Sequence, residues 1–76
     1  SNIFISNMIK EDNKIIIKGN NFYPKMILEI NGEKINFDWI NENKIKFENK
    51  NFKTDNLKIN MYLEDSKGNI IARLKK

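Results

Sequence analysis

The side chains that most often perform catalysis are scarce in this chain. It has no histidine and no cysteine among its 76 residues, so the usual general base, the thiol nucleophile and the commonest zinc ligands are missing. Its serine and threonine hydroxyls fall in or near predicted loops or at the start of the chain: Ser1, Ser6, Thr54 and Ser66. Its three glycines form no phosphate-binding loop. These absences predict a protein that is not an enzyme and that uses no cofactor.

The ten acidic residues do not suggest an active site or a metal site either. Hydrolysis by paired carboxylates needs two of them about 5 to 10 Å apart in a cleft, and a chain this short has little room for a cleft. Two neighbouring pairs, Glu11–Asp12 and Glu64–Asp65, lie in predicted loops. Neither pair matches a calcium-binding loop. We therefore expect both pairs to be solvated or to form turns, and we predict no metal site.

Three aromatic residues are the candidates for binding a partner: Tyr23, Trp39 and Tyr62. Tyr62 falls on the polar side of a predicted strand, with Lys58 and Asn60 nearby, and Tyr23 falls in a predicted loop. An exposed ring at these places could stack on a sugar or a nucleobase, or anchor a protein partner. The alternative is that each ring covers a neighbouring edge of the core.

The composition indicates the type of genome before it indicates a function. The 14 Ile, 14 Asn and 13 Lys make up more than half of the chain, and valine and glutamine are absent. AT-rich codons encode the three abundant residues, so we infer a low-GC bacterium as the source. The net charge of +4 is spread over lysines that recur every few residues, which is typical of the solvent face of strands. We therefore do not expect nucleic acid to be the partner.

No segment predicts a membrane span or a targeting signal. The longest apolar run, Ile15 to Ile17, is far shorter than the ~20 residues of a membrane-spanning helix, and no stretch has the pattern of a signal peptide. Ser1–Asn2 has the form of a tag scar, in which case residues 3–76 are one excised domain. The hydrophobic content of 39% exceeds that of a disordered chain, so we expect a soluble globular domain.

Apolar residues recur with a period of two along much of the chain, which indicates strands. The predicted strands cover residues near 3–9, 15–17, 26–30, 33–37, 45–47, 57–63 and 70–74. The turn cluster 65–69 predicts a C-terminal hairpin, and Asn31-Gly32 predicts another, because this pair favours the tightest hairpin turns. About seven short antiparallel strands without a helical pattern predict an all-β sandwich or a small barrel.

Three elements, in order along the chain, carry a family resemblance. The first is a strand that runs into Gly19-Asn20-Asn21-Phe22, and the second is the strand and hairpin Met26–Gly32. The third comprises an aromatic residue, a short loop and an Ile-x-Phe strand, here Trp39, Asn43, Ile45 and Phe47. Together these elements resemble an IPT/TIG domain, which opens with Gly-x-Asn-Phe after a strand. The resemblance covers residues 3–74 and implies an immunoglobulin-like β-sandwich.

The same residues have a physical interpretation of their own. Gly19 is expected to permit a backbone turn, and Asn21 to hold that turn by hydrogen bonds to its neighbours' backbone. Phe22 is expected in the core. Two segments depart from the family pattern, because Asn7–Asn13 lacks the usual Pro-x-x-Gly and Glu48-Asn49 stands where a proline is common.

The resemblance implies a non-catalytic accessory module of a larger bacterial surface or secreted protein, and hence an extracellular or cell-surface location. Its partners would be the neighbouring domains of the same chain, and a protein or a carbohydrate would be a further ligand. In the resemblance Trp39 fills one end of the sandwich. This place favours a core or half-core role for Trp39 over a role as a ligand platform.

Three alternatives remain open. A carbohydrate-binding module in its own right would use Tyr62 as a platform. Nucleic-acid binding, known for a related domain of Rel-type transcription factors, would require the lysines to gather on one face. Association through an exposed edge strand is the third alternative, and we expect lysines such as Lys44 and Lys46 to guard against it.

Overall fold

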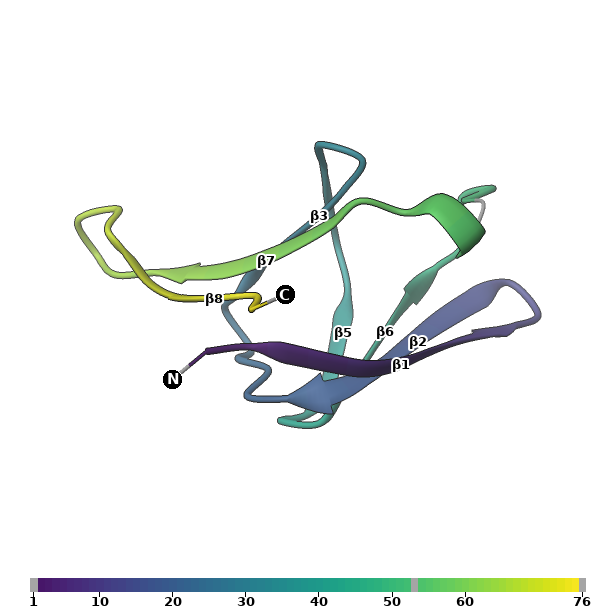
Figure 1. Cartoon of the computed structure of the whole chain (residues 1–76), viewed down its shortest axis with the longest axis horizontal. Coiled ribbons are helices and arrows are strands. Elements are labelled where there is room, and N and C mark those ends of the chain that lie inside the picture. The colour runs from purple at the N-terminus through teal and green to yellow at the C-terminus, as the bar shows by residue number, and fades with distance from the viewer. Residues whose placement is uncertain (1, 53, 76) are drawn as a thin grey trace.

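A computed structural model describes residues 2–52 and 54–75 of the chain (Figure 1). We interpret Ser1–Asn2 as a tag scar, and Ser1 lies outside the described residues. The elements are β1 Phe4–Glu11, β2 Lys14–Asn20, β3 Ile27–Ile30, β4 Glu33–Ile35, β5 Asp38–Asn41, β6 Lys44–Glu48, the 3-10 helix η1 Thr54–Asn56, β7 Ile59–Glu64 and β8 Ile70–Arg73. In this part of the chain no helix is long and apolar enough to cross a membrane.

The strands form two four-stranded antiparallel sheets, ordered β1-β2-β6-β5 and β4-β3-β7-β8. The sheets pack against each other as a sandwich, which confirms the predicted all-β fold class. Burial alternates along β2, β3 and β6. Side chains at every second position of these strands therefore face the other sheet, and those between them face solvent.

Isoleucine dominates the core between the sheets. The buried core residues are Ile3, Ile15, Ile17, Phe22, Met26, Leu28, Ile30, Ile35, Ile45, Phe47 and Met61. Phe22 is 2% exposed, so its predicted place in the core is confirmed. The connection after β6 adds Phe52, which packs edge-on against Phe47 with 6.4 Å between the ring centroids. A connection that reads as polar in sequence thus helps to close the core.

The beginning of the chain joins the two sheets. β1 pairs with β2 in the first sheet, but Ile3 forms a parallel bridge with Leu74, beside the second sheet. The Ile3 N–H donates to the Arg73 carbonyl at 2.9 Å, and the Lys75 N–H donates to the Ile3 carbonyl at 2.8 Å. The two ends of the described chain therefore lie side by side, as Figure 1 shows.

Both predicted hairpins are confirmed. Asn31 and Gly32 have φ angles of 54° and 83° between β3 and β4, as the tightest hairpin turn requires. In the turn between β7 and β8, the Asp65 carboxylate accepts the N–H groups of Lys67 and Asn69, each at 2.9 Å. The hydrogen bonds from Asn69 are the main reason why the pKa of Asp65 lies below its ordinary value.

The structure contains one strand that the sequence analysis did not predict. This strand is β5, which lies at the edge of the first sheet and pairs with β6 through Trp39 and Ile45. All four residues of β5 are exposed, so the strand lacks the alternation that reveals the others. The register also shifts after Trp39, which interrupts the period of two.

Gly19 has a different role from the one expected. It lies within β2 and not in a turn, and a Cβ atom there would collide with the backbone carbonyl of Phe4 on β1. The positive φ of the turn falls instead on Asn21, at 64°. The Asn21 amide does not bond to its neighbours; it donates to the Asn2 carbonyl at 2.7 Å. Gly19 is therefore required for the close approach of β1 to β2.

Lys44 and Lys46 do not guard an edge, so that prediction is wrong. Both lie on β6, which has β2 on one side and β5 on the other. The error has a simple cause, because the unpredicted β5 covers the edge that β6 would otherwise present. The edge strands are β1 and β5 in one sheet and β4 and β8 in the other.

We expect Gly19→Ala to destabilise the domain. The obstacle is a backbone carbonyl, which cannot rotate away as a side chain would. Overpacking of this kind costs about 1–3 kcal/mol, and each kcal/mol lowers the melting temperature of a domain this size by roughly 4–8 °C. Thermal unfolding followed by circular dichroism measures the change.

Two further variants test whether Gly19 is needed because β1 lies close to it or because it permits a turn. Gly32→Asn should be nearly neutral, because asparagine tolerates positive φ and no atom lies within 4 Å of the added Cβ. Gly19→Asn should be as damaging as Gly19→Ala. A stable Gly19→Asn variant would contradict the close approach of β1 to β2 at Gly19.

Candidate functional site

The outer face of the second sheet gathers polar side chains around Tyr62. Glu29 on β3 and Asn60 on β7 are directly opposite each other, while Tyr62 lies between Ile27 on β3 and Arg73 on β8. Residues directly opposite each other in an antiparallel pair project from the same face. Tyr62 therefore shares one surface with a carboxylate, an amide and a guanidinium group.

Glu29 is the hydrogen-bond acceptor at the centre of this surface. The Tyr62 hydroxyl donates to Glu29 Oε2 at 3.1 Å, and Asn60 Nδ2 donates to Glu29 Oε1 at 3.2 Å. These two bonds hold the carboxylate and the phenol in fixed positions. A shallow cavity of about 360 Å³ lies here, and we name its lining residues the Tyr62 face: Glu29, Asn60, Tyr62, Glu64, Gly68, Ile70 and Arg73.

The pKa of Tyr62 lies above its ordinary value of 10.0. Partial removal of the phenol from water is the largest cause. The hydrogen bond to Glu29 is the second, and the negative charges of Glu29 and Glu64 add to it. The phenol therefore stays protonated at neutral pH. The Tyr62 face presents a half-buried ring, carboxylate acceptors and amide and guanidinium donors, which together suit a ligand rich in hydroxyl groups.

Trp39 and Tyr23 do not belong to this face. Trp39 lies on the first sheet, is 39% exposed, and donates from Nε1–H to the Phe22 carbonyl at 2.9 Å. Tyr23 follows Phe22 in the chain and is half-buried against the core. Trp39 and Tyr23 therefore adjoin one loop, whereas Tyr62 lies on the outer surface of the opposite sheet. The three predicted binding residues do not form one platform.

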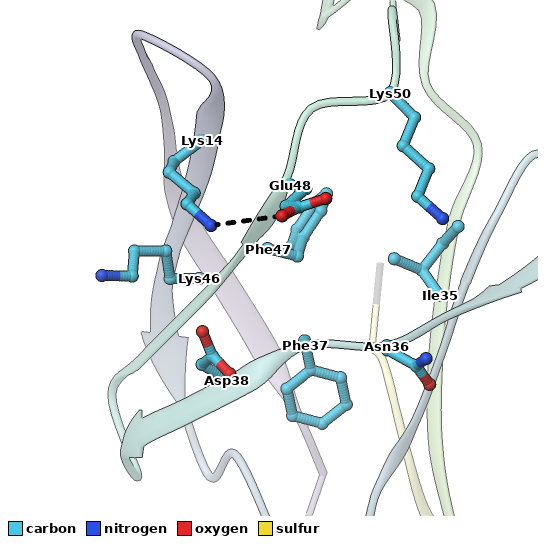
Figure 2. Close-up of a pocket in the computed structure, with 9 residues that line it drawn as sticks. All are labelled: Lys14, Ile35, Asn36, Phe37, Asp38, Lys46, Phe47, Glu48 and Lys50. Carbon is cyan, nitrogen blue, oxygen red and sulfur yellow. Dashed lines mark ion pairs between the residues drawn. The ribbon is translucent and has the colours of Figure 1, made fainter.

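A second cavity opens where the chain crosses from the second sheet to the first. Asn36 and Phe37 connect β4 to β5, and the cavity beside them has a volume of about 270 Å³ (Figure 2). Its lining residues are Lys14, Ile35, Asn36, Phe37, Asp38, Lys46, Phe47, Glu48 and Lys50. Figure 2 shows Lys14 directed toward Glu48, with 3.8 Å between Lys14 Nζ and Glu48 Oε1. Charges of both signs therefore surround the opening.

Acidic residues also accompany the lysines on the outer face of the first sheet. Four lysines project there from β2 and β6: Lys14, Lys18, Lys44 and Lys46. Lys14 lies between Glu11 and Glu48 on the neighbouring strands, and Lys46 lies opposite Asp38. A long polyanion would meet these three carboxylates as well as the lysines, so the face attracts it less than an uninterrupted basic stripe would.

The described residues offer no constellation for metal binding. In residues 2–52 and 54–75, no three acidic side chains lie close enough together to hold a metal ion. The Ser6 hydroxyl donates to the Lys18 carbonyl at 3.2 Å. That hydroxyl therefore serves the pairing of β1 with β2, at the point where their register shifts.

Sequence reasoning named Tyr62 as a candidate but did not name Glu29, to which the Tyr62 hydroxyl donates. Glu29 is 33 residues away along the chain, and it meets Tyr62 only because β3 pairs with β7 in the observed register. The alternation of apolar and polar residues does place both side chains on solvent-facing positions of their strands. No local signal specifies which distant strands pair, so the sequence could not bring the two residues together.

Comparison with known proteins gives one match. The model of the IPT/TIG domain family matches residues 1–72, which is nearly the whole chain. Searches of the curated proteins and of the solved structures found no match. The family comprises immunoglobulin-like domains that are typically non-catalytic modules, and the two-sheet sandwich described above agrees with that fold.

The Tyr62–Glu29 hydrogen bond can be tested by titration. Tyr23→Phe leaves Tyr62 as the sole tyrosine, so absorbance at alkaline pH reports on it alone. We expect a midpoint above 10.0, and we expect Glu29→Gln to lower it, because the substitution removes a nearby negative charge. A raised pKa stabilises the fold fully below 10.0, and this stabilisation is lost as the pH rises through the folded-state pKa. A midpoint at 10.0 that Glu29→Gln does not move would contradict the bond.

Proposed function

The chain belongs to the IPT/TIG domain family, and we propose that it serves as a non-catalytic accessory module of a larger bacterial surface or secreted protein. In this role it connects the domains on either side of it and holds them apart. The parallel pairing of Ile3 with Leu74 is the observation that carries the proposal.

This pairing sets the directions in which the chain enters and leaves the module. Two strands in a parallel pair run the same way, so polypeptide that precedes Ile3 and polypeptide that follows Leu74 would lead away in opposite directions. Domains attached at the two ends would therefore have the sandwich between them. The backbone hydrogen bonds of Ile3 to Arg73 and Lys75 fix this arrangement, which favours a spacer over a flexible linker.

The location can be tested on intact cells of the bacterium that encodes the chain. Brief trypsin treatment of the cells, followed by complete digestion of the released protein, should yield the peptide Ile59–Lys67, which lies between two tryptic sites. Mass spectrometry detects the peptide, and an abundant cytoplasmic protein serves as the control for lysis. Release of this peptide only after the cells are broken would contradict a surface location. A complete gene product with no other domain would contradict the accessory role.

The Tyr62 face favours carbohydrate binding as a second candidate function. Its cavity combines an aromatic ring with a carboxylate that accepts two hydrogen bonds. Aromatic rings pack against the apolar faces of sugars, and fixed polar groups then select among hydroxyl positions. The carboxylate and the ring come from two adjacent strands, so their relative position does not depend on a loop.

A screen of soluble glycans by isothermal titration calorimetry tests this second candidate. A glycan that binds the Tyr62 face should lose affinity with Tyr62→Ala, because the substitution removes the aromatic surface against which the sugar packs. Glu29→Gln should weaken binding by about tenfold, since hydrogen bonds to a charged group are worth about 1.5–3 kcal/mol. Tyr23→Ala should leave the affinity unchanged. If no glycan of a broad panel binds, carbohydrate binding is excluded. If only Tyr23→Ala lowers the affinity, the binding site lies at the loop after Phe22 instead.

A further inference from the structure

Three rows of side chains run across the strands on the outer face of the first sheet. Residues directly opposite each other in antiparallel pairs project from the same face, so the strand pairing gives the members of each row. The first row is Glu11, Lys14 and Glu48, the second is Ile9, Ile16, Lys46 and Asp38, and the third is Asn7, Lys18, Lys44 and Asn41. We name the third the Lys18 row, and it alone of the three has no carboxylate.

Two positive charges meet at the centre of the Lys18 row. Lys18 on β2 is directly opposite Lys44 on β6, and like charges at such positions destabilise a sheet. Among residues 2–52 and 54–75, the one ion pair joins Lys14 to Glu48. The ammonium groups of Lys18 and Lys44 therefore have no carboxylate partner in the described part of the chain, and a bound anion would relieve their repulsion.

The asparagines at the two ends of the row add hydrogen-bond donors. The side-chain oxygen of each already accepts a backbone N–H: that of Met8 at 2.9 Å for Asn7, and that of Asn43 at 2.8 Å for Asn41. This leaves the amide NH₂ group of each side chain, which is a donor only. The Lys18 row therefore presents donors along its whole length.

We propose that the Lys18 row binds a single sulfate or phosphate group carried by a larger ligand. The group lies between the ammonium groups of Lys18 and Lys44, which bind it as point charges. Such an ester has three acceptor oxygens, so it accepts from both lysines with an oxygen to spare. Asn7 and Asn41 donate to neutral oxygen atoms of the ligand on either side of the charged group.

The neighbouring rows limit the ligand to one charged group. Strands in a sheet lie about 4.8 Å apart, so the four strands of the row span roughly 14 Å. A ligand that follows the row meets only donors. A chain of negative charges that runs along the strands instead meets Asp38 in the second row and Glu11 and Glu48 in the first. The site therefore suits an otherwise neutral ligand that bears one sulfate or phosphate ester.

A nuclear magnetic resonance titration of the isotope-labelled 76-residue chain tests the proposal. The probes are inorganic phosphate and inorganic sulfate, with sodium chloride adjusted to keep the ionic strength constant. We expect shift changes centred on Lys18 and Lys44 and on the side-chain amides of Asn7 and Asn41. Lys18→Gln or Lys44→Gln should each weaken binding roughly two- to fivefold, the range for an exposed ion pair, and the double variant should abolish it.

The phosphate and sulfate esters of glucose then distinguish the two sources of the charged group. Both should shift the same signals as the free ions and lose affinity with Lys18→Gln, whereas glucose itself should not shift them. The ester that binds more tightly identifies the class of ligand.

Lys14→Gln is the matched control, because it removes the same charge from the same face in a row where carboxylates flank the lysine. It should leave the affinity for the anions unchanged. In the absence of these anions Lys18→Gln should raise the melting temperature, because it removes one member of a like-charge pair.

Each outcome supports or overturns the proposal. Affinity that depends on Lys18 and Lys44 and not on Lys14 supports it. Equal losses with Lys14→Gln and Lys18→Gln overturn it, because the anion would then respond only to the net charge of the face. Unchanged signals at Lys18 and Lys44, or a lower melting temperature of the Lys18→Gln variant without anions, also overturn it. The accessory role and the Tyr62 face, which lies on the other sheet, do not depend on the result.

Discussion

The backbone pairing of Ile3 with the last strand is the contact on which the two-sheet arrangement depends. Ile3 is fully buried and bonds to Arg73 and Lys75, while the strand that follows it pairs with β2 in the other sheet. Elsewhere the sheets meet mainly through side chains and are linked by the three connections that cross between them, β2–β3, β4–β5 and β6–β7. A chain this small buries only roughly 60% of the surface that its unfolded form exposes, and it has no cysteine for a disulfide. A directional backbone link at the sheet edge therefore matters more here than it would in a larger domain.

The Gly-x-Asn-Phe motif serves that link. Gly19 leaves room for the carbonyl of Phe4, which allows β1 to lie close to β2. Asn21 holds the chain at the start of β1, because its side-chain amide donates to the Asn2 carbonyl. Asn43 fixes the turn from the far side, because its Nδ2 donates to the Gly19 carbonyl at 2.8 Å and its own carbonyl accepts the Gly19 N–H at 2.9 Å. Phe22 then fills the core beneath. The motif thus works as a device for positioning the first strand, and its residues are committed to structure.

The sequence predicted the features that depend on local chemistry. The hairpin at Asn31-Gly32 follows from two residues that adopt positive φ, and the alternation from Ile59 to Leu63 identifies a strand regardless of its partners. It failed where an element is defined by its neighbour. The strand β5 has no buried position of its own, and its pairing with β6 is what makes it a strand. The role of Gly19 likewise depends on β1, which lies 15 residues earlier in the chain at Phe4.

Whether the polar groups of a surface support the fold decides how easily that surface can acquire a partner. The loop end of the sandwich has its polar groups paired internally, since Asn43 bonds to Gly19 and Asn20 and the Trp39 indole bonds to the Phe22 carbonyl. The outer face of the second sheet is different, because Tyr62 and Asn60 both donate to Glu29 and these bonds do not support the turn or the core. These side chains can change without loss of the Ile3 link. A binding surface is therefore easier to evolve on this face than at the end of the sandwich where the family motif lies, and its residues must be sought through strand pairing and not through the motif.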